Sequence, residues 1–385
     1  MAVAAIFFLN GVSVASWVVR IPDAQRALSL TSGTLGLALL GAAAGALVAM
    51  PVAGRMVTRY GSRVVTCAAA ILYGGTLALP AVAPSLLLLL VALIVNGAAN
   101  GSLNVSMNAQ ASTIERAHGQ PIMASFHALF SGGGLAGAAG GGLIAAAGVR
   151  PGLHLAGVGV VTIVVTLLAW QFLFPARFEE HPHEEAVGEA APQGRRLAIL
   201  GVLAFSVLFA EGAMGDWSAV YLRDVAGAGP GLAATGYAAF SIAMALGRVV
   251  GDRLTARLGA TRTVGVGALV ATAGIALALV DTRTRAIAIG FGAVGGGLAT
   301  AFPSVLTAAS RVPGMKAGSG IAAVATLGYF GLLAGPPLIG FVAQLTNLRG
   351  GIAVVGLACF VTALLARSLA ERSAAPVPVR RASAA

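Results

Sequence analysis

The chain has 385 residues, of which 58% are hydrophobic and only 10% are charged. Its mean hydropathy of +0.90 excludes an ordinary soluble globular protein, in which apolar residues make up about 45–50%. Apolar runs long enough to cross a hydrocarbon core of about 30 Å as helices recur along the whole sequence. The composition therefore predicts an all-α membrane protein.

We expect twelve transmembrane helices, separated by short breaks that carry Arg, Pro, Gly or Asp. The first run has no basic start and no A-x-A site, so it predicts a span rather than a cleavable signal peptide. It begins at residue 2 without a charged flank, which leaves a longer natural N-terminus open. The expected spans cover residues 2–20, 33–53, 64–83, 85–112, 122–147, 152–175, 197–222, 232–251, 263–281, 285–308, 318–345 and 348–368.

The break between the sixth and seventh spans is polar, acidic and proline-containing. Residues 176–196 read ARFEEHPHEEAVGEAAPQGRR and hold five of the thirteen carboxylates. Such a composition predicts a solvated linker. We therefore expect two six-helix halves, residues 1–175 and 197–370, followed by a short tail at 371–385.

The net charge of +11 is explained by where the basic residues fall. With these spans, 17 of the 24 Lys and Arg residues lie on one side of the membrane and 7 on the other. The positive-inside rule then places both termini, the linker and the tail in the cytoplasm. Because the excess charge follows membrane topology, we do not expect nucleic-acid binding.

An internal repeat relates the two halves. The segment GRMVTRYGSR, which begins at Gly54, resembles DRLTARLGATR, which begins at Asp252. A shift of 198 residues matches several positions of equivalent helices, namely Arg55/Arg253, Arg59/Arg257, Gly61/Gly259, Ser106/Ser304 and Gly137/Gly335. Two parallel six-helix repeats joined by a cytoplasmic linker are typical of alternating-access transporters, which hold the solute near the midplane where the halves meet.

The basic, glycine-bracketed loops after the second and eighth spans resemble the signature loop of the major facilitator superfamily (MFS), and the resemblance covers essentially the whole chain. It implies the MFS fold of twelve helices in two pseudo-symmetric halves. The family loop usually has Asp before the arginine, where this chain has Thr58 and Ala256. An Asp latch is therefore not expected at those positions, and Asp252 is the shifted alternative.

Four local segments, RIPDAQRALSL, NVSMNAQAS, SFHALFSGGGLAGA and EGAMGDWSAVYLRD, resemble the branch of the superfamily related to fucose permeases. That resemblance implies a permease of the bacterial cytoplasmic membrane that takes up or exports a small polar solute, often with protons. We expect a monomer, because this fold does not need a partner to form its pathway. Members of the branch often carry an acid where this chain has Asn104. Proton coupling is therefore expected elsewhere in this chain, or not at all.

Four asparagines recur every four residues in the fourth span, at Asn96, Asn100, Asn104 and Asn108. On a helix this spacing keeps them on one broad face, and an amide that faces lipid without a partner is costly. Singly they suit hydrogen bonds between helices. As a row, we favour a cavity wall that binds a hydroxyl-rich or amide-bearing solute.

Glu211 lies about fourteen residues into the expected span 197–222, near mid-membrane. An ionised carboxylate is costly there, which favours the protonated form and makes Glu211 the expected proton-coupling site. The alternative is a structural acid bonded to a neighbouring helix. Asp216, on a different face of the same helix, and His127, about one turn into the fifth span, are further proton-coupling candidates. A histidine bonded within the core is the more frequent outcome for His127.

Trp17 and Trp217 occupy nearly equivalent positions in the two halves. Either they stack on a sugar ring or they anchor helices at the membrane interface, as tryptophans near span ends commonly do. The basic loops are candidates for a cytoplasmic gate that latches the halves together, or for anchors to anionic membrane lipid. The gate candidates are Arg55, Arg59, Arg63, Arg253, Arg257 and Asp252.

Other function classes lack sequence support. We find no metal-spaced His and Cys set, phosphate loop or nucleophile elbow, so we expect neither an enzyme nor a bound metal or cofactor. A sensor built on a transporter fold would normally carry an extra soluble domain. We predict a secondary active transporter that moves a small polar, sugar-like solute by alternating access in symport with protons. An exporter or an uncoupled facilitator is the nearest alternative.

Overall fold

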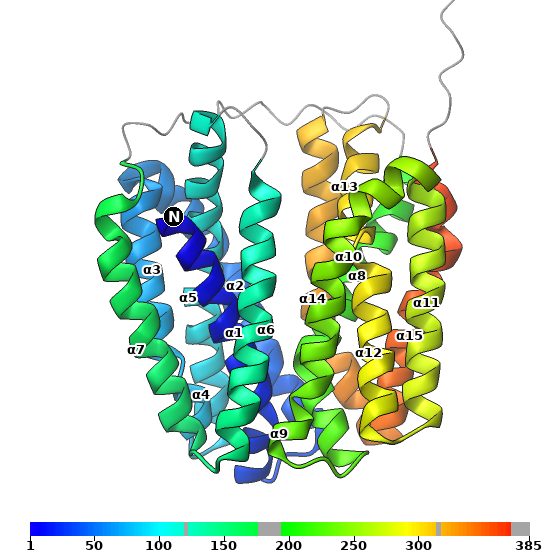
Figure 1. The fold of residues 1–385 in the computed structure, drawn as a ribbon, viewed down its shortest axis with the longest axis horizontal. Helices are drawn as coiled ribbons and strands as arrows, with labels where there is room; N and C mark the ends of the chain where they lie inside the picture. Colours follow the sequence, from blue (N-terminus) through cyan, green and yellow to red (C-terminus); the bar gives the residue numbers. More distant parts are fainter. Residues whose placement is uncertain (119–121, 176–193, 313–316, 371–385) are drawn as a thin grey trace, which may run out of the picture.

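A computed structural model describes residues 1–118, 122–175, 194–312 and 317–370 of the chain. Within these ranges, twelve helical segments are long and apolar enough to cross a membrane, which confirms the predicted number of spans. The segments stand side by side in one bundle (Figure 1). Most of the expected linker and all of the expected tail, residues 176–193 and 371–385, lie outside the described residues.

The first half of the chain supplies six of these spans. Two of them are built from two pieces, α3 with α4 and α7 with the 3₁₀ helix η1. The elements are α1 (Ala2–Ala27), α2 (Ser32–Tyr60), α3 (Ser62–Thr76), α4 (Leu79–Val82), α5 (Leu86–His118), α6 (Met123–Ala146), α7 (Pro151–Ala169) and η1 (Trp170–Phe172).

The second half supplies the other six spans. Three of them are built from two pieces, α9 with α10, α12 with α13, and α15 with the 3₁₀ helix η3. The elements are α8 (Gly194–Asp224), α9 (Pro230–Ala233), α10 (Thr235–Leu258), α11 (Ala260–Val280), α12 (Thr284–Leu298), α13 (Ala301–Ser310), α14 (Ala317–Leu345), α15 (Leu348–Leu365) and η3 (Ala366–Leu369).

Two helices extend beyond the spans that hydropathy predicts and end at equivalent glycines. α2 continues to Tyr60 and α10 to Leu258, because backbone hydrogen bonding continues after the apolar run has ended. Each helix stops at a glycine with positive φ, 82° at Gly61 and 78° at Gly259, a conformation that residues with a side chain rarely adopt. The two basic loops of the expected repeat therefore begin with the same backbone geometry.

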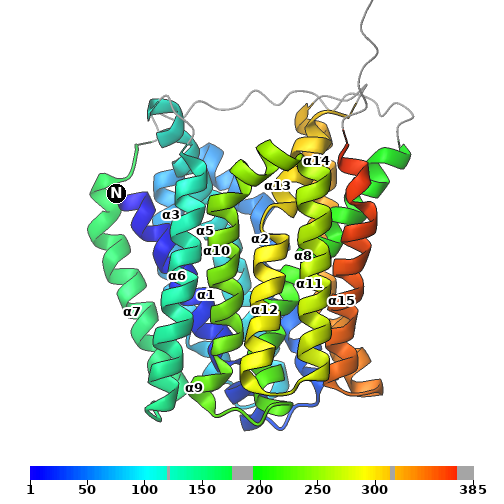
Figure 2. The same ribbon diagram turned by 45° about the vertical axis from the view of Figure 1, so that its right-hand side comes forward.

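The two halves stand next to each other, with α1–α7 on one side of the bundle and α8–α15 on the other (Figures 1 and 2). They meet closely at the end where α1 leads into α2, which we call the closed end. There a Cβ on Gly36 of α2 would lie 2.4 Å from the carbonyl oxygen of Pro336 on α14, and one on Gly340 would lie 2.5 Å from that of Ser32. Only hydrogen fits at the two glycines, so the backbones of both halves touch here.

An apolar core surrounds α8 and reaches into the first half. Trp217 and Tyr221 of α8 are fully buried in it, and Ile21 and Leu35 of the first half belong to the same cluster. A second cluster lies within the first half around Phe7. Apolar packing thus joins the halves near the closed end, in addition to the glycine contact.

Candidate functional site

A cavity of about 2630 Å³ lies at the opposite end of the bundle, which we call the cavity end. Its wall comes from α6 of the first half and from α8, α10, α11, α13 and η3 of the second. Arg195, Gly259 and Ser368 lie at helix ends and line it, so the cavity reaches the surface on this side. The molecule therefore offers access from one end while the other end is in contact.

Arg248 is the charged lining residue that lies farthest from a helix end. It is near the middle of α10, and 36% of its side chain is exposed. Its Nη2 lies 3.9 Å from Oε2 of Glu211 on α8, and its Nη1 donates a hydrogen bond of 3.4 Å to Oγ of Ser131 on α6. One guanidinium therefore connects two helices of the second half to a helix of the first.

His127, an expected proton-coupling residue, lines the cavity one turn before Ser131. The Ser131 hydroxyl donates a hydrogen bond of 3.1 Å to the His127 carbonyl oxygen, and the imidazole lies within electrostatic range of Arg248. The ring also packs edge-on against Phe7, with centroids 5.5 Å apart. The structure thus places His127 on the cavity wall, one helical turn from the Ser131 hydroxyl that accepts from Arg248.

The two acids of α8 differ in their partners. Glu211 is 20% exposed and has Arg248 as its ion-pair partner. Asp216 is half-buried further along the helix, and the structure shows no ion pair for it among the described residues. The Tyr237 hydroxyl lies within electrostatic range of both carboxylates and of Arg248. We call the residues gathered around the guanidinium the Arg248 cluster: His127, Ser131, Glu211, Tyr237 and Arg248.

The four asparagines of α5 that we expected to form a cavity wall are not among the described residues that line the cavity. Asn96 Nδ2 donates to Oγ1 of Thr76 on α3 at 3.1 Å, and Asn100 Oδ1 accepts from Nδ2 of Asn10 on α1 at 2.9 Å. The remaining two are half-buried and bond to each other within α5. Of the two roles that the sequence leaves open, the first two asparagines make interhelical bonds in this conformation.

The two tryptophans also lie away from the cavity. Trp217 is fully buried in the core around α8, and its Nε1 has no hydrogen-bond partner in the described structure. Trp17 is partly buried on α1 and packs against both apolar cores. In this conformation neither tryptophan contacts the cavity, and both pack against other helices.

The five arginines of the expected cytoplasmic gate lie at the cavity end, and none of them bridges the halves in the described structure. The guanidinium of Arg59 stacks on Tyr60 at 5.2 Å and that of Arg63 on Trp170 at 4.6 Å, both within the first half. The other three arginines are exposed: Arg55, Arg253 and Arg257. No ion pair involves any of the five within the described ranges. The side chain of Asp252 lies outside what the structure describes.

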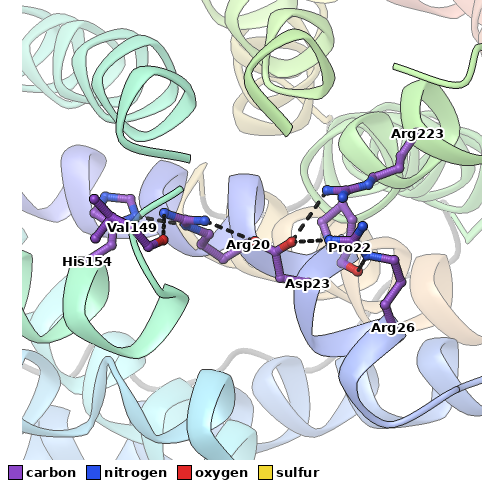
Figure 3. A network of polar contacts seen from close by, with 7 residues as sticks. All are labelled: Arg20, Pro22, Asp23, Arg26, Val149, His154 and Arg223. Carbon is purple, nitrogen blue, oxygen red and sulfur yellow. Dashed lines mark hydrogen bonds and ion pairs between the residues drawn. The ribbon is translucent and has the colours of Figure 1, made fainter. Parts of the chain in front are cut away.

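A charged network joins the halves at the closed end (Figure 3). Asp23 on α1 accepts from Arg20 at 3.0 Å and from Arg26 at 2.5 Å, and its Oδ1 lies 3.4 Å from Nη1 of Arg223 on α8. Arg20 is buried and also donates to Nδ1 of His154 on α7 at 3.1 Å. Because Asp23 and Arg223 belong to different halves, their ion pair holds the closed end together.

Sequence reasoning alone misses Arg248 and the Asp23–Arg223 pair. By hydropathy, Arg248 counts among the basic residues near the end of a span, and only its contact with Glu211 distinguishes it. The RIPDAQR segment does signal a local ion pair, because Arg20 and Asp23 are three residues apart. The partner on α8, however, is 200 residues away, and no spacing rule connects them.

The fold and the cavity define a membrane transporter. Twelve spans in two halves, a polar cluster where the halves meet and a cavity that the described residues leave open at one end make up that architecture. The arrangement supports movement of a solute between two surfaces rather than a reaction upon it.

The chain belongs to the Major Facilitator Superfamily, whose family model matches residues 2–332 and 227–385. It is 36% identical over 363 residues to an uncharacterised MFS-type transporter of Yersinia pestis, with 94% of each chain covered. It is also 34% identical over 375 residues to an uncharacterised transporter of Sinorhizobium fredii, covering 96% of this chain and 97% of that one. The protein is therefore a multi-pass MFS-type transporter and not an enzyme.

Solved structures share the fold at low sequence identity. A mutant form of the nucleoside transporter NupG has a TM-score of 0.78 at 13% identity, covering 96% of this chain and 99% of that one. The E. coli fucose:proton symporter FucP has a TM-score of 0.61 at 15% identity, covering 96% and 98%. These likenesses show the fold alone. They do not single out the fucose-permease branch that the local motifs resemble.

Proposed function

We propose that the protein imports a small polar, hydroxyl-bearing solute together with protons across the bacterial cytoplasmic membrane, as a monomer and by alternating access. The observation that carries the proposal is the Arg248 cluster, in which Glu211 and its cation lie beside a cavity where the halves meet. The distribution of Lys and Arg supports cytoplasmic termini and therefore a cavity that faces the cytoplasm.

Glu211 is the proposed proton site. An ionised carboxylate inside the membrane needs a partner, and its ion pair with Arg248 is long, at 3.9 Å. The carboxyl is 20% exposed and its partner Arg248 lines the cavity, so we assign the delivery and removal of its proton to water beside Arg248. His127 in the same wall is the proposed proton relay, and Asp216 is a second acceptor further along α8.

The two ends of the bundle supply the proposed gates. In this conformation the Asp23–Arg223 pair and the α2–α14 glycines hold the closed end together. We assign to the basic loops that begin at Gly61 and Gly259 the closure of the cavity end in the opposite conformation. In that opposite conformation, three half-buried residues of α1 and α5 that the sequence predicts as solute-binding would contact the solute: Trp17, Asn104 and Asn108.

Proteoliposomes that enclose a pH dye test this function. Wild type and Glu211→Gln are challenged with sugars, sugar acids, amino acids and cationic drugs while the internal pH is recorded. We expect at least one solute class to drive proton movement in the wild type and Glu211→Gln to abolish it. Arg285→Gln, which changes an exposed arginine at the closed end, is the control and should retain the signal.

Other outcomes identify other functions. Solute movement without a proton signal in wild type and Glu211→Gln would identify an uncoupled facilitator in which Glu211 is structural. Proton movement opposite to solute movement would identify an exporter. If no solute of the panel moved, a membrane sensor built on this fold would become the better account.

A further inference from the structure

The described part of the cavity wall carries charges of one sign. Its described lining residues include six arginines and one histidine, and no described lining residue is Asp or Glu. The arginines are Arg195, Arg196, Arg248, Arg262, Arg311 and Arg367. A cleft lined by one sign of charge raises the local concentration of the opposite ion. The described wall therefore favours anionic solutes.

Membrane topology accounts for all of these arginines except Arg248. The others lie near helix ends at the cavity end, where basic residues are expected in a cytoplasmic boundary. Arg248 lies near the middle of α10 but only three residues before the end of the apolar span Pro230–Gly251. Among the described lining arginines it is the one that pairs with a carboxylate inside the membrane, Glu211 of α8, where a charged group is costly and usually marks a functional site. Its position therefore needs a reason other than topology.

The described residues leave part of the hydrogen-bonding capacity of the Arg248 guanidinium unused. Its contacts measure 3.9 Å to Glu211 and 3.4 Å to Ser131, whereas charge-assisted hydrogen bonds of arginine are typically about 2.7–2.9 Å. The side chain is 36% exposed and lines the cavity. The planar fork thus presents N–H donors to the cavity that the described residues satisfy only weakly.

We propose, as an extension of the proposed transport function, that Arg248, oriented by Ser131 and assisted by His127, binds the carboxylate of a small organic anion. The fork of arginine matches two carboxylate oxygens at once, and His127 lines the same wall. A neutral sugar offers the guanidinium no matching charge, and a cation is repelled by the arginines. The solute is accordingly a hydroxylated organic acid rather than a neutral sugar.

Binding of a carboxylate to Arg248 also explains how solute and proton are linked. A solute that engages the fork displaces Glu211, which then is an unpaired carboxylate inside the membrane and takes up a proton from the cavity water. The other titratable groups near the pair among the described residues are Tyr237, Asp216 and His127. One anion and one proton then move together, and their charges cancel.

Binding to the purified protein is measured as the shift in its thermal unfolding midpoint with matched ligands. Galacturonate is compared with galactose and galactosamine, gluconate with glucitol, and lactate with lactamide. We expect a carboxylate to stabilise the wild type more than its neutral and cationic analogues do. Arg248→Gln should weaken binding of that carboxylate at least about tenfold, and Arg248→Lys, which keeps the charge without the fork, should weaken it less. Arg285→Gln is the matched control, with unchanged binding.

Two results would overturn the proposal: no carboxylate that exceeds its analogues in any matched set, or an unchanged carboxylate affinity in Arg248→Gln. If Arg248→Gln does not fold, Arg248→Lys and the ligand comparison on the wild type decide the question. A neutral solute that drives proton entry, blocked by Glu211→Gln, would retain symport and remove the anion site. Carboxylate binding that depends on Arg248, without proton movement, would retain the anion site and remove proton coupling.

Discussion

Arg248 shows how one side chain changes the role of its neighbours. Ser131 bonds to its own helix through the carbonyl oxygen of His127, and Glu211 is an acid on the middle of α8. The guanidinium connects both of them to the cavity wall. Topology alone would classify Arg248 as a basic residue that flanks a membrane span. Its contacts make it the centre of the polar site instead.

We expect the pH dependence of transport to come from this cluster and not from the loop carboxyl of Asp281. Asp281, between α11 and α12, has its pKa lowered to about 2 by hydrogen bonds from Arg283. A carboxyl with a lowered pKa keeps its pairing at higher pH and loses it only as the pH falls through that value. Asp281 therefore stays ionised throughout the physiological range.

Gly61→Ala is predicted to destabilise the protein. At φ 82° and ψ 150° the backbone of Gly61 lies in a region that essentially only glycine adopts, and a residue with a side chain held there costs about 1–3 kcal/mol. Gly54→Ala, on α2 with open space around the added Cβ, should instead stabilise the helix by about 0.5–1 kcal/mol. Thermal unfolding in detergent measures the two shifts, and shifts of the same sign would contradict this account.

At the scale of helices, the contact of α2 with α14 determines whether the two halves can meet at the closed end. The crossing depends on glycines of both helices, Gly36 and Gly340, and on the carbonyl of Pro336. Pro336 and Pro337 lie inside α14, where proline removes backbone donors and bends a helix. At this crossing α2 and α14 therefore approach each other through backbone rather than through side chains.

Gly36→Ala is predicted to shift the protein away from the conformation with an open cavity end. The added Cβ would lie 2.4 Å from the Pro336 carbonyl oxygen, a backbone atom that cannot rotate away, so α2 and α14 must separate. A cysteine placed at Ala245 in the cavity wall should then react more slowly with a membrane-impermeant maleimide applied from the cavity side. Gly140→Ala, with open space around its Cβ, is the control.

The same labelling experiment has a low background. Cys67 and Cys359 are both buried, so the introduced cysteine supplies the reactive thiol. Equal labelling rates in Gly36→Ala and Gly140→Ala would show that the glycine contact does not govern closure.

At the scale of the whole molecule, one end is held by charge and backbone contact while the other holds an open cavity. Asp23 is the common acceptor for two arginines of its own helix and for Arg223 of the other half. At the cavity end, the structure shows no ion pair for the described basic-loop arginines. Alternating access requires this asymmetry to reverse.

Arg223→Gln is predicted to favour opening of the closed end. It removes the contact between halves and leaves Asp23 paired with Arg20 and Arg26, whereas Asp23→Asn weakens all three pairs and should have the larger effect. For a pair worth about 1 kcal/mol, the open population rises about fivefold. Distances between spin labels on the outer ends of α1 and α8 measure the shift.

Arg349→Gln serves as the control for that experiment. Arg349 is exposed at the same end and has no ion pair within the described residues. A distance distribution in Arg223→Gln that equals those of wild type and Arg349→Gln would exclude the Asp23–Arg223 pair as a gate.

The sequence by itself determined the number of spans, the repeat and the superfamily. Apolar run length is a local property, and the offset of 198 residues between Gly61 and Gly259 is visible without coordinates. Only the tertiary structure decided which polar groups meet: Glu211 with Arg248, Asn100 with Asn10, and Asp23 with Arg223. The physical reason is that packing between helices sets the rotation of each helix about its axis and the end at which the halves close. Hydropathy measures only how apolar a segment is, so it gives neither the rotation of a helix nor the end at which the halves close.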